Sequence, residues 1–385
     1  MSDISEKFKR AIKRTDKLLL PISIILSVIS ITLLLGLFKS GMLGSKRTII
    51  IQGIAVTIGV IGGIILSEID MDWLAPLWKI YIPPVVILMV LTFFIGVERE
   101  GSENRSWLKI GGVSIQPSEF LKIGFILSFA YHLSQVYENI NKPRVLIPVL
   151  LHGAFPVLLI LLQKDDGVAI VMMAIIVAML FSAGISLKYV LAAALVVPVA
   201  IPVLWFGIMS EFQKKRFMVI WDRSLDPLGI GYQQLRGLTS MGSGRIFGNG
   251  LFSPEHVYVP ENYNDFIFTF LGDAFGFVGC LLVIILIATI CGRVIHIGCL
   301  SENPLGKFIC TGVFAMIAIQ TIMNVSMCLM IMPVIGVTLP FMSAGGSAAI
   351  SNFAAIGLAM SVHRTNRKNM FDKDLYINTG IKRTQ

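Results

Sequence analysis

Apolar runs of about 20 residues recur along almost the whole of this 385-residue chain. Each run is long enough to cross a bilayer as a helix. The runs begin near Leu18, Thr48, Leu77, Ser118, Val145, Val168, Leu187, Phe266, Phe308 and Pro340. They predict an all-α, multi-pass transmembrane helical bundle of about ten spans. Backbone that leaves the helical conformation is then expected only at the membrane rims or lining a cavity.

The charge pattern favours a membrane protein over one that binds nucleic acid. Only 14% of the residues are charged, and the net charge is +9, whereas about a quarter are charged in soluble domains. Much of the positive charge lies in 1–17 and 364–385. Basic flanks of spans stay in the cytoplasm, which predicts two cytoplasmic tails around a membrane domain over 18–363. The first run is too long for a signal-peptide core and no small-residue cleavage site follows, so we expect it to be retained.

Two polar segments fall outside when the spans alternate from a cytoplasmic start. They cover residues 96–117 and 210–264, whereas the basic turns with Lys142 and Arg144, and with Arg293 and Lys307, fall inside. Connections beyond about 15 residues are usually functional or disordered. The segment 210–264 carries aromatic residues and glycines, so we expect one large, folded outer loop that holds the chemistry.

Cysteine and glycine patterns exclude several other classes of function. The five cysteines all lie late in the chain, and Cys291, His296 and Cys299 lack a fourth ligand at zinc-like spacing. We interpret them as small residues of membrane helices. Phosphate-binding and dinucleotide-binding glycine motifs are missing from the sequence, so no nucleotide cofactor is expected.

Ionisable residues in or beside spans are costly and tend to be functional. Glu119 and Lys122 are three residues apart near the start of the fourth run, so they share a helix face. A structural ion pair and a direct catalytic role are both open for them. Asp165 and Asp166 lie in a short outer turn, for which a solvated turn is the simpler interpretation.

Asp265 ends the long outer loop and directly precedes the apolar residues 266–271. Its carboxylate is therefore expected at the boundary between lipid and water. Aspartate at the start of a helix is often a cap, so a cap and a catalytic carboxylate are both open.

Basic and small residues supply candidates for substrate binding. Bases of the outer loop can meet anionic lipid headgroups or hold a diphosphate; they are Lys214, Lys215, Arg216, Arg223, Arg236 and Arg245. Glycines between them would let backbone N–H groups approach an anion; they are Gly242, Gly244, Gly248 and Gly250. Small residues from 343 onward favour close helix packing, with the lining of a lipid groove as the alternative.

Several motifs follow one another in a characteristic order. They are Arg105-Ser106-Trp107-Leu108, Ser114-Ile115-Gln116-Pro117-Ser118-Glu119 with Lys122, Gln163-Lys164-Asp165-Asp166-Gly167, Asp226-Pro227-Leu228-Gly229-Ile230-Gly231-Tyr232-Gln233, Gly242-Ser243-Gly244, Gly248-Asn249-Gly250, Asp265-Phe266-Ile267-Phe268, and Leu339-Pro340-Phe341-Met342-Ser343 with Gly345-Gly346-Ser347. This order resembles the SEDS family of cell-shape, elongation, division and sporulation proteins (RodA, FtsW and SpoVE). The resemblance spans nearly the whole chain beyond the first two helices.

The resemblance implies a peptidoglycan glycosyltransferase of the bacterial plasma membrane. Such an enzyme polymerises lipid II into glycan strands on the outer face, and undecaprenyl diphosphate leaves. Asp265 would be the general base, with Glu119, Lys122 and Asp165 in support. Candidates for holding the substrate diphosphate are Arg105, Arg216, Arg223, Arg236 and Arg245, and candidates for lining a groove are Ser343, Gly345, Gly346 and Ser347.

The same resemblance implies partners and leaves room for a metal. The implied partner is a class B penicillin-binding protein, a transpeptidase, together with other elongation or division proteins. A divalent cation, Mg²⁺ or Mn²⁺, is an option for stabilising the leaving diphosphate. Two other functions stay open at this point, a lipid II flippase and a non-catalytic scaffold that activates the transpeptidase.

Five motif positions depart from the family pattern. They are Lys164, Asp166, Asn264, Thr338 and Ala344. The departures suggest a divergent paralogue, and Arg105-Ser106-Trp107 leans toward the RodA side. The motifs leave open whether the chain serves elongation, division or sporulation.

Overall fold

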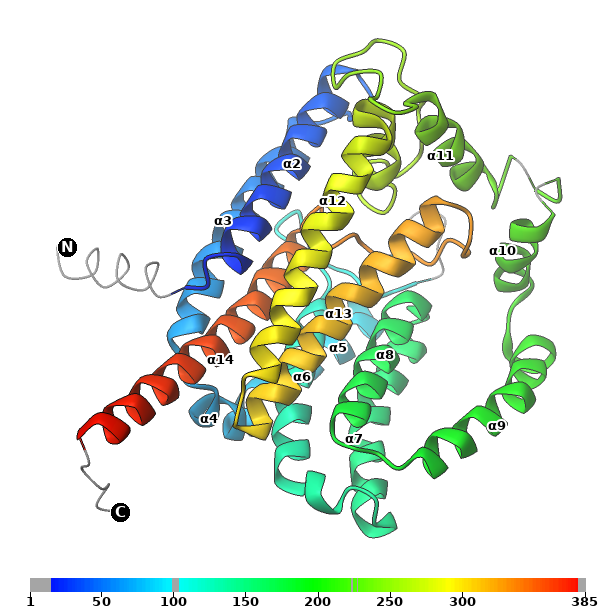
Figure 1. The fold of residues 1–385 in the computed structure, drawn as a ribbon. Helices are drawn as coiled ribbons and strands as arrows, with labels where there is room; N and C mark the ends of the chain where they lie inside the picture. The colour runs from blue at the N-terminus through cyan, green and yellow to red at the C-terminus, as the bar shows by residue number, and fades with distance from the viewer. Residues whose placement is uncertain (1–14, 99–103, 223, 227, 380–385) are drawn as a thin grey trace.

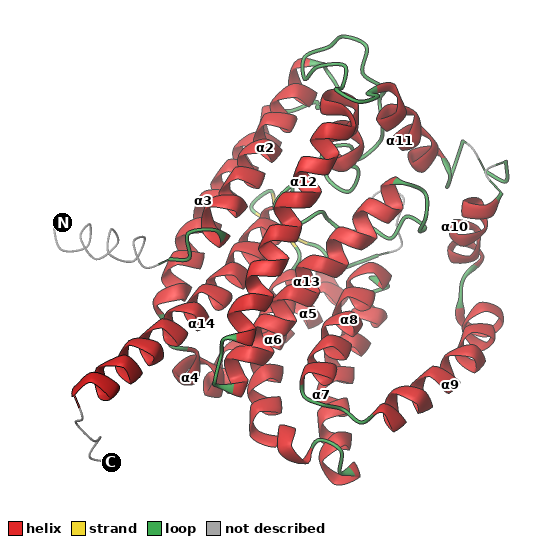
Figure 2. Cartoon of the chain, viewed as in Figure 1, coloured by secondary structure: helices red, strands yellow, loops and turns green. Residues whose placement is uncertain are grey.

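The computed structural model describes residues 15–98, 104–222, 224–226 and 228–379, most of them helical (Figures 1 and 2). The longer helices are α2 (Leu19–Lys39), α3 (Lys46–Glu68), α5 (Trp78–Ile95), α6 (Pro117–Val136), α7 (Pro143–Leu162), α8 (Asp166–Ser182), α9 (Leu187–Val203), α12 (Ile267–Cys299), α13 (Pro304–Cys328) and α14 (Gly346–Thr379). The shorter elements are α4 (Met71–Leu74), η1 (Ala75–Leu77), η2 (Tyr137–Asn139), η3 (Leu204–Ile208), α10 (Glu211–Trp221) and α11 (Tyr232–Ser243). Strands β1 (Leu108–Ile110) and β2 (Val113–Ile115) form an antiparallel hairpin.

The predicted multi-pass helical architecture is confirmed. Within the described residues, seven helices are long and apolar enough to cross a membrane. The first residue of each predicted apolar run lies within six residues of the first residue of one of the longer helices. The count of about ten spans and the cytoplasmic placement of both ends stay predictions. The last helix continues through the predicted basic tail as far as Thr379.

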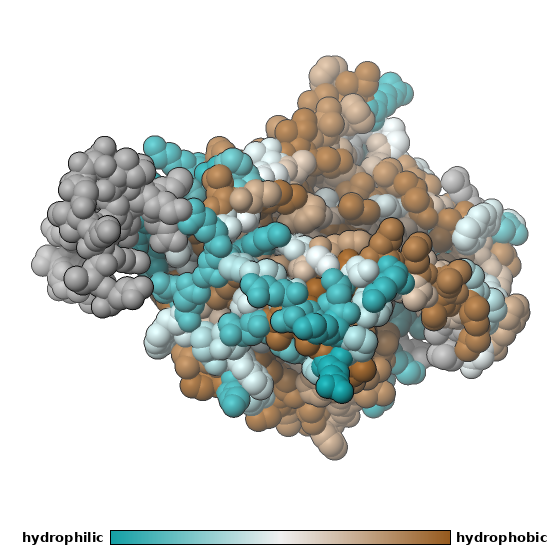
Figure 3. Space-filling model, turned by 60° about the horizontal axis from the view of Figure 1, so that its bottom comes forward, coloured by the Kyte–Doolittle hydropathy of each residue, from teal (hydrophilic) through white to brown (hydrophobic). Residues whose placement is uncertain are grey.

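The two ends of the bundle differ in what they carry. At one end, which we call the cavity face, the N-termini of α3, α6 and α8 meet the β1–β2 hairpin; Arg47 donates to the Gly112 carbonyl at 2.8 Å there. At the opposite face, Asp16 binds Arg293 at 2.7 Å and Glu68 binds Arg364 at 3.0 Å. Figure 3 shows hydrophilic side chains gathered over this opposite face and apolar side chains around it.

Small residues let α3 and α14 pack side by side (Figure 1). A Cβ atom on Gly357 would lie 2.7 Å from the Gly63 carbonyl oxygen, and one on Gly63 would lie 2.7 Å from the Phe353 oxygen. Any larger residue would push the two backbones apart, so the glycines set this distance. Close packing is therefore one role of the small residues in the last helix.

A kink in α12 is bonded to the loop that precedes it. Gly276 has φ +64°, which breaks the helix, and the chain 245–250 runs alongside the break. The N–H groups of Asn249 and Gly250 donate to the carbonyls of residues 273 and 274, at 2.8 and 3.0 Å. The segment 245–250 thus supplies hydrogen-bond donors to carbonyls of α12 beside the break. The Gly250 N–H is used there, and the Gly248 N–H donates to the Gly244 carbonyl at 2.7 Å, so these two of the glycines predicted to approach an anion have internal acceptors.

The segment 210–264, which we predict to be one large outer loop, contains the helices α10 and α11. Helix α10 starts with a capping box between Ser210 and Gln213. Gln234 of α11 donates to the carbonyls of Met327 and Met332, at 3.0 and 2.7 Å, which ties α11 to the end of α13. Figure 1 shows α9, α10 and α11 as an arc beside the main bundle.

Candidate active site

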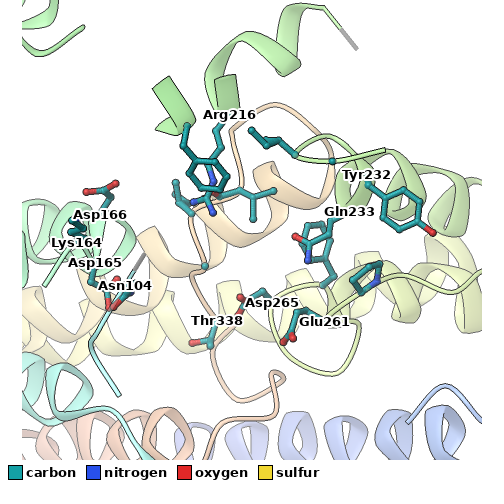
Figure 4. A pocket seen from close by; sticks show the side chains of 18 of the residues that line it. Asn104, Lys164, Asp165, Asp166, Arg216, Tyr232, Gln233, Glu261, Asp265 and Thr338 are labelled. Carbon is teal, nitrogen blue, oxygen red and sulfur yellow. The ribbon is translucent and has the colours of Figure 1, made fainter. Parts of the chain in front are cut away.

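A cavity of about 600 Å³ opens on the cavity face, with Asp265 in its wall (Figure 4). We call it the Asp265 cavity. Figure 4 shows Asp265 between Thr338 and Glu261, with Asn104 and Asp165 to one side and Tyr232 and Gln233 to the other. The charged residues that line it are Lys164, Asp165, Asp166, Arg216, Asp226, Glu261 and Asp265.

The backbone around Asp265 is fixed from three directions. Asn324 of α13 donates from its single amide nitrogen to the carbonyls of Asp265 and Val337, at 2.8 and 2.7 Å. Ser343 donates to the Asn264 carbonyl at 2.7 Å. A Cβ atom on Gly336, whose φ is +67°, would lie 3.7 Å from the Asp265 carboxylate, so backbone passes close to it. The backbone that carries the Asp265 carboxylate is therefore held in one place.

Asp265 is not the cap of α12. The N-cap position belongs to Phe266, which makes no side-chain cap bond, and Asp265 lies one residue earlier. Its side chain is 6% exposed and lines the cavity. The structure places Asp265 one residue before the N-cap, in the wall of a cavity.

Asp165 does cap a helix, and it is buried. Its carboxylate accepts the Val168 N–H at 3.2 Å and the Gln116 side-chain amide at 3.0 Å. The solvated turn expected from the sequence is therefore wrong for Asp165, which is 3% exposed. Burial raises the pKa of this carboxyl above its usual value, against the lowering effect of its hydrogen bonds. Asp165 supports the cavity wall by joining the starts of α6 and α8.

Glu119 and Lys122 form an ion pair inside the bundle. Their charged atoms are 2.9 Å apart, and both side chains are buried. Ser351 of α14 donates to the other Glu119 oxygen at 2.8 Å. Neither residue lines the Asp265 cavity. The pair joins α6 to α14 behind the site.

The predicted diphosphate-binding arginines are spread apart. Arg216 lines the Asp265 cavity and donates to the Val334 carbonyl at 3.1 Å. Arg105 is exposed and binds Glu98 at 2.6 Å, while Arg236 donates to the Tyr258 carbonyl at 3.1 Å. Arg245 is exposed, and like Arg105 and Arg236 it does not line this cavity. Arg223 lies outside the described residues.

The small residues at 343–347 divide between support and lining. Ser343 holds the Asn264 carbonyl, and the Ser347 hydroxyl accepts the Gln116 N–H at 3.1 Å. Gly345 and Gly346 line a second cavity beside the first. Whether these residues also line a lipid groove, the alternative posed from the sequence, stays a prediction.

Asp273, which the sequence analysis did not single out, is the most heavily bonded carboxylate near the site. It is fully buried in α12, and His256 Nδ1 lies 3.2 Å from it. Its hydrogen-bond donors are Ser240, Ser243, Asn249 and the Val257 N–H, at 2.8 to 3.2 Å. All of them precede α12, so Asp273 fastens the outer loop to the helix. The sequence signal that could have identified Asp273 is a carboxylate within an apolar run.

The donor set suits a metal only together with a substrate. Among the described residues, no group of three or more His, Cys, Asp or Glu side chains is placed to hold a metal ion. Mg²⁺ often needs only one or two protein carboxylates when substrate phosphates supply further ligands. Glu261 and Asp265 line the same cavity and match that requirement.

The fold and the site define a class: a multi-pass helical membrane protein with a buried carboxylate in a polar cavity at one end. A profile of the cell cycle protein family FtsW/RodA/SpoVE matches residues 13–368. The chain belongs to this family, and it is a multi-pass protein of the bacterial membrane.

Relatives and solved structures agree with this assignment. Stage V sporulation protein E of Bacillus subtilis (strain 168) is 32% identical over 336 residues, which are 86% of this chain and 89% of that protein. Peptidoglycan glycosyltransferase MrdB of Escherichia coli (strain K12) is 32% identical over 297 residues, 75% of this chain and 78% of that protein.

Two solved structures share the fold. A chain from a peptidoglycan synthase complex has a TM-score of 0.73 and 23% identity, over 89% of this chain and 97% of that chain. The rod shape determining protein RodA of Thermus thermophilus has a TM-score of 0.65 and 22% identity, over 91% of this chain and 97% of that chain.

Proposed function

We propose that this protein is a peptidoglycan glycosyltransferase that polymerises lipid II on the outer face of the plasma membrane. The observation that carries the proposal is the Asp265 carboxylate, fixed in the wall of a polar cavity of about 600 Å³ at one end of a membrane bundle. Relatives named as peptidoglycan glycosyltransferases support the reaction class. A lipid-anchored substrate would present its sugars at this level, directly above the hydrocarbon.

Asp265 acts as the general base in this proposal. Its carboxylate takes the proton from the 4-hydroxyl of the acceptor N-acetylglucosamine. The hydroxyl oxygen attacks the anomeric carbon of the donor N-acetylmuramic acid, with inversion. The bond from that carbon to the diphosphate oxygen breaks, and its electron pair leaves with undecaprenyl diphosphate. The remaining rate enhancement comes from orientation and from stabilisation of the leaving group.

Arg216 and Lys164 are the bases that line the Asp265 cavity and can face the leaving diphosphate. Five carboxylates line it as well, so the protein charges there are mainly negative. A divalent cation held by Glu261 would neutralise charge on the diphosphate when bound, and it would leave Asp265 free to act as the base. Dialysis against a chelator is expected to lower the polymerisation rate, and readdition of Mg²⁺ or Mn²⁺ is expected to restore it.

The proposed partner is a membrane-anchored transpeptidase of the class B penicillin-binding type. One similar structure comes from a peptidoglycan synthase complex, which supports an assembly of this kind. We also propose contacts with other elongation or division proteins. A flippase and a non-catalytic scaffold explain less, because neither needs a carboxylate fixed in an outer cavity.

Polymerisation by purified protein tests the proposal. Labelled lipid II is incubated with the wild-type protein in lipid nanodiscs, alone and with the transpeptidase. Glycan ladders in either reaction are the expected result. Transport of lipid II in vesicles without any ladder would favour the flippase, and stimulation of the transpeptidase without any ladder would favour the scaffold.

A further inference from the structure

Three consecutive carbonyl groups before α12 accept hydrogen bonds from one part of the fold, the end of α13 and the connection that follows it. The carbonyls of residues 263–265 accept, in that order, the Ala344 N–H at 2.9 Å, the Ser343 hydroxyl at 2.7 Å and the Asn324 side-chain amide at 2.8 Å. The segment that carries the Asp265 carboxylate is therefore held at each of its residues.

Asn324 and Ser343 each bind a second segment as well, residues 337–339. The same Asn324 nitrogen donates to the carbonyl of residue 337 at 2.7 Å, and the same Ser343 oxygen accepts the N–H of residue 339 at 2.8 Å. Thr338 between them lines the Asp265 cavity, and Figure 4 shows it beside Asp265. The two side chains thus fix the segment that carries the carboxylate relative to a second part of the cavity wall.

Asn324 belongs to α13, a helix of 25 residues, and its side chain is fully buried. Full burial keeps the amide away from a substrate, so it can act on a reaction only through the groups that it holds. Cys328, one turn further along α13, also faces the Asp265 carbonyl, with 3.8 Å between its sulfur and that oxygen. Two consecutive turns of one helix therefore contact the Asp265 backbone, and helices position functional groups more precisely than loops do.

The position of a general base affects turnover more than it affects binding. The base has to meet the proton that it takes at hydrogen-bond distance, and a displacement of about 1 Å can lower a rate by about 10²-fold. Loss of the Asn324 amide would leave the Asp265 and Val337 carbonyls without this donor, so the two segments could move apart. Substrate affinity is spread over the many residues that line the cavity, so it would change little.

We propose that Asn324 is a positioning residue of the glycosyl transfer, which holds Asp265 at a fixed place relative to residues 337–339. Ser343 braces the same two segments at a second point. This inference rests on the proposed glycosyltransferase function. It deepens that function by giving a part in the reaction to a residue of α13 that does not itself line the Asp265 cavity.

Separate measurements of turnover and of lipid II binding test the role of Asn324. Asn324→Leu has a similar size and removes the amide. Its turnover at saturating lipid II is expected to fall at least about tenfold, while its affinity for lipid II in nanodiscs stays within about twofold of the wild type. Wild-type turnover would overturn the positioning role. A loss of affinity that explains the whole loss of rate would overturn it too.

A matched control makes the same replacement at the opposite face of the bundle. Asn366 is also a buried asparagine, and it donates to the Ile297 carbonyl at 3.0 Å. Asn366→Leu is expected to lower the unfolding temperature as Asn324→Leu does, but to keep turnover within about twofold of the wild type. An equal loss of turnover in both variants would overturn the positioning role, because general destabilisation would then explain it.

A smaller change keeps the test open if Asn324→Leu does not fold. Ser343→Ala removes the hydroxyl of the second brace, and it is expected to lower turnover at unchanged lipid II affinity. A folded Ser343→Ala protein with wild-type turnover would overturn the brace in that case.

Hydrogen exchange reads the brace without turnover and separates this inference from the proposed function. Asn324→Leu is expected to raise amide exchange in residues 261–269 and 337–343, whereas Asn366→Leu is not. Raised exchange in a protein whose wild type forms no glycan ladders would retain the brace and remove the polymerase. Ladders from the wild type, with exchange and turnover unchanged in Asn324→Leu, would retain the polymerase and remove the positioning role.

Discussion

Two carboxylates eight residues apart, Asp265 and Asp273, show how the surroundings of a residue decide its task. Asp265 is held through its backbone, by Asn324 and by the chain at Gly336, and its carboxylate lines a cavity. Asp273 is fully buried, and both of its oxygens accept hydrogen bonds from the loop before α12. The first is therefore suited to meet a substrate, and the second to hold the loop that ends at the first.

Replacement of Asp273 by alanine is expected to destabilise the protein and to lower its activity. The change leaves the buried Ser240 hydroxyl and the part-buried Val257 N–H without their acceptor, at about 1–3 kcal/mol for a buried group. Thermal unfolding of detergent-solubilised protein should therefore shift down by several degrees. Glu255→Ala, an exposed acidic position in the same loop, should leave the unfolding temperature unchanged. Equal unfolding temperatures for the Asp273 and Glu255 variants would contradict the anchoring role.

At the scale of the helices, buried polar contacts fix how elements lie behind the cavity. Glu119 on α6 is paired with Lys122 and accepts from Ser351 on α14, and α14 in turn packs closely on α3. A buried ion pair adds little net stability, yet loss of one partner leaves an uncompensated charge in an apolar surrounding. The pair therefore contributes more to the specific arrangement of the helices than to the stability of the protein.

Replacement of one residue of this pair should cost more stability than replacement of both. Lys122→Met is expected to destabilise the protein by about 3–5 kcal/mol, because Glu119 stays buried without its partner. Glu119→Gln with Lys122→Met should recover most of that stability and of the polymerisation rate. The exposed pair Glu211 and Lys214 has the same spacing, and Lys214→Met should cost less than about 1 kcal/mol. A double variant that is as stable as the wild type yet inactive would instead assign the pair to catalysis.

At the scale of the whole molecule, the apolar runs and the motifs predicted the helices and the family. The starts of the helices follow from hydrophobicity alone, since a span of about 20 apolar residues has few alternatives in a bilayer. The position of Asp265 at the start of α12 was also evident from the sequence. Its place one residue before the N-cap and in the wall of a cavity was not, because the sequence does not fix a helix start to a single residue.

Contacts between distant segments were beyond the reach of the sequence. Arg47 lies at the start of α3 and Lys109 in the β1–β2 hairpin, and only the folded chain brings them to one cavity. The sequence does not show what the segment with Gly248 and Gly250 contacts, whereas in the fold this segment is hydrogen-bonded to α12 beside its kink. Charge patterns identified a basic outer loop, but they could not show that of its described arginines only Arg216 lines the Asp265 cavity.

A comparison of the wild type with Asp265→Asn tests whether Asp265 is the general base of lipid II polymerisation. Polymerisation rate and lipid II binding are measured side by side for the wild type and for Asp265→Asn, an isosteric change that removes the base. Loss of the base is expected to leave binding unchanged and to lower the rate by about 10²–10⁴-fold. An Asp265→Asn protein that polymerises lipid II at the wild-type rate would show that Asp265 is not the base.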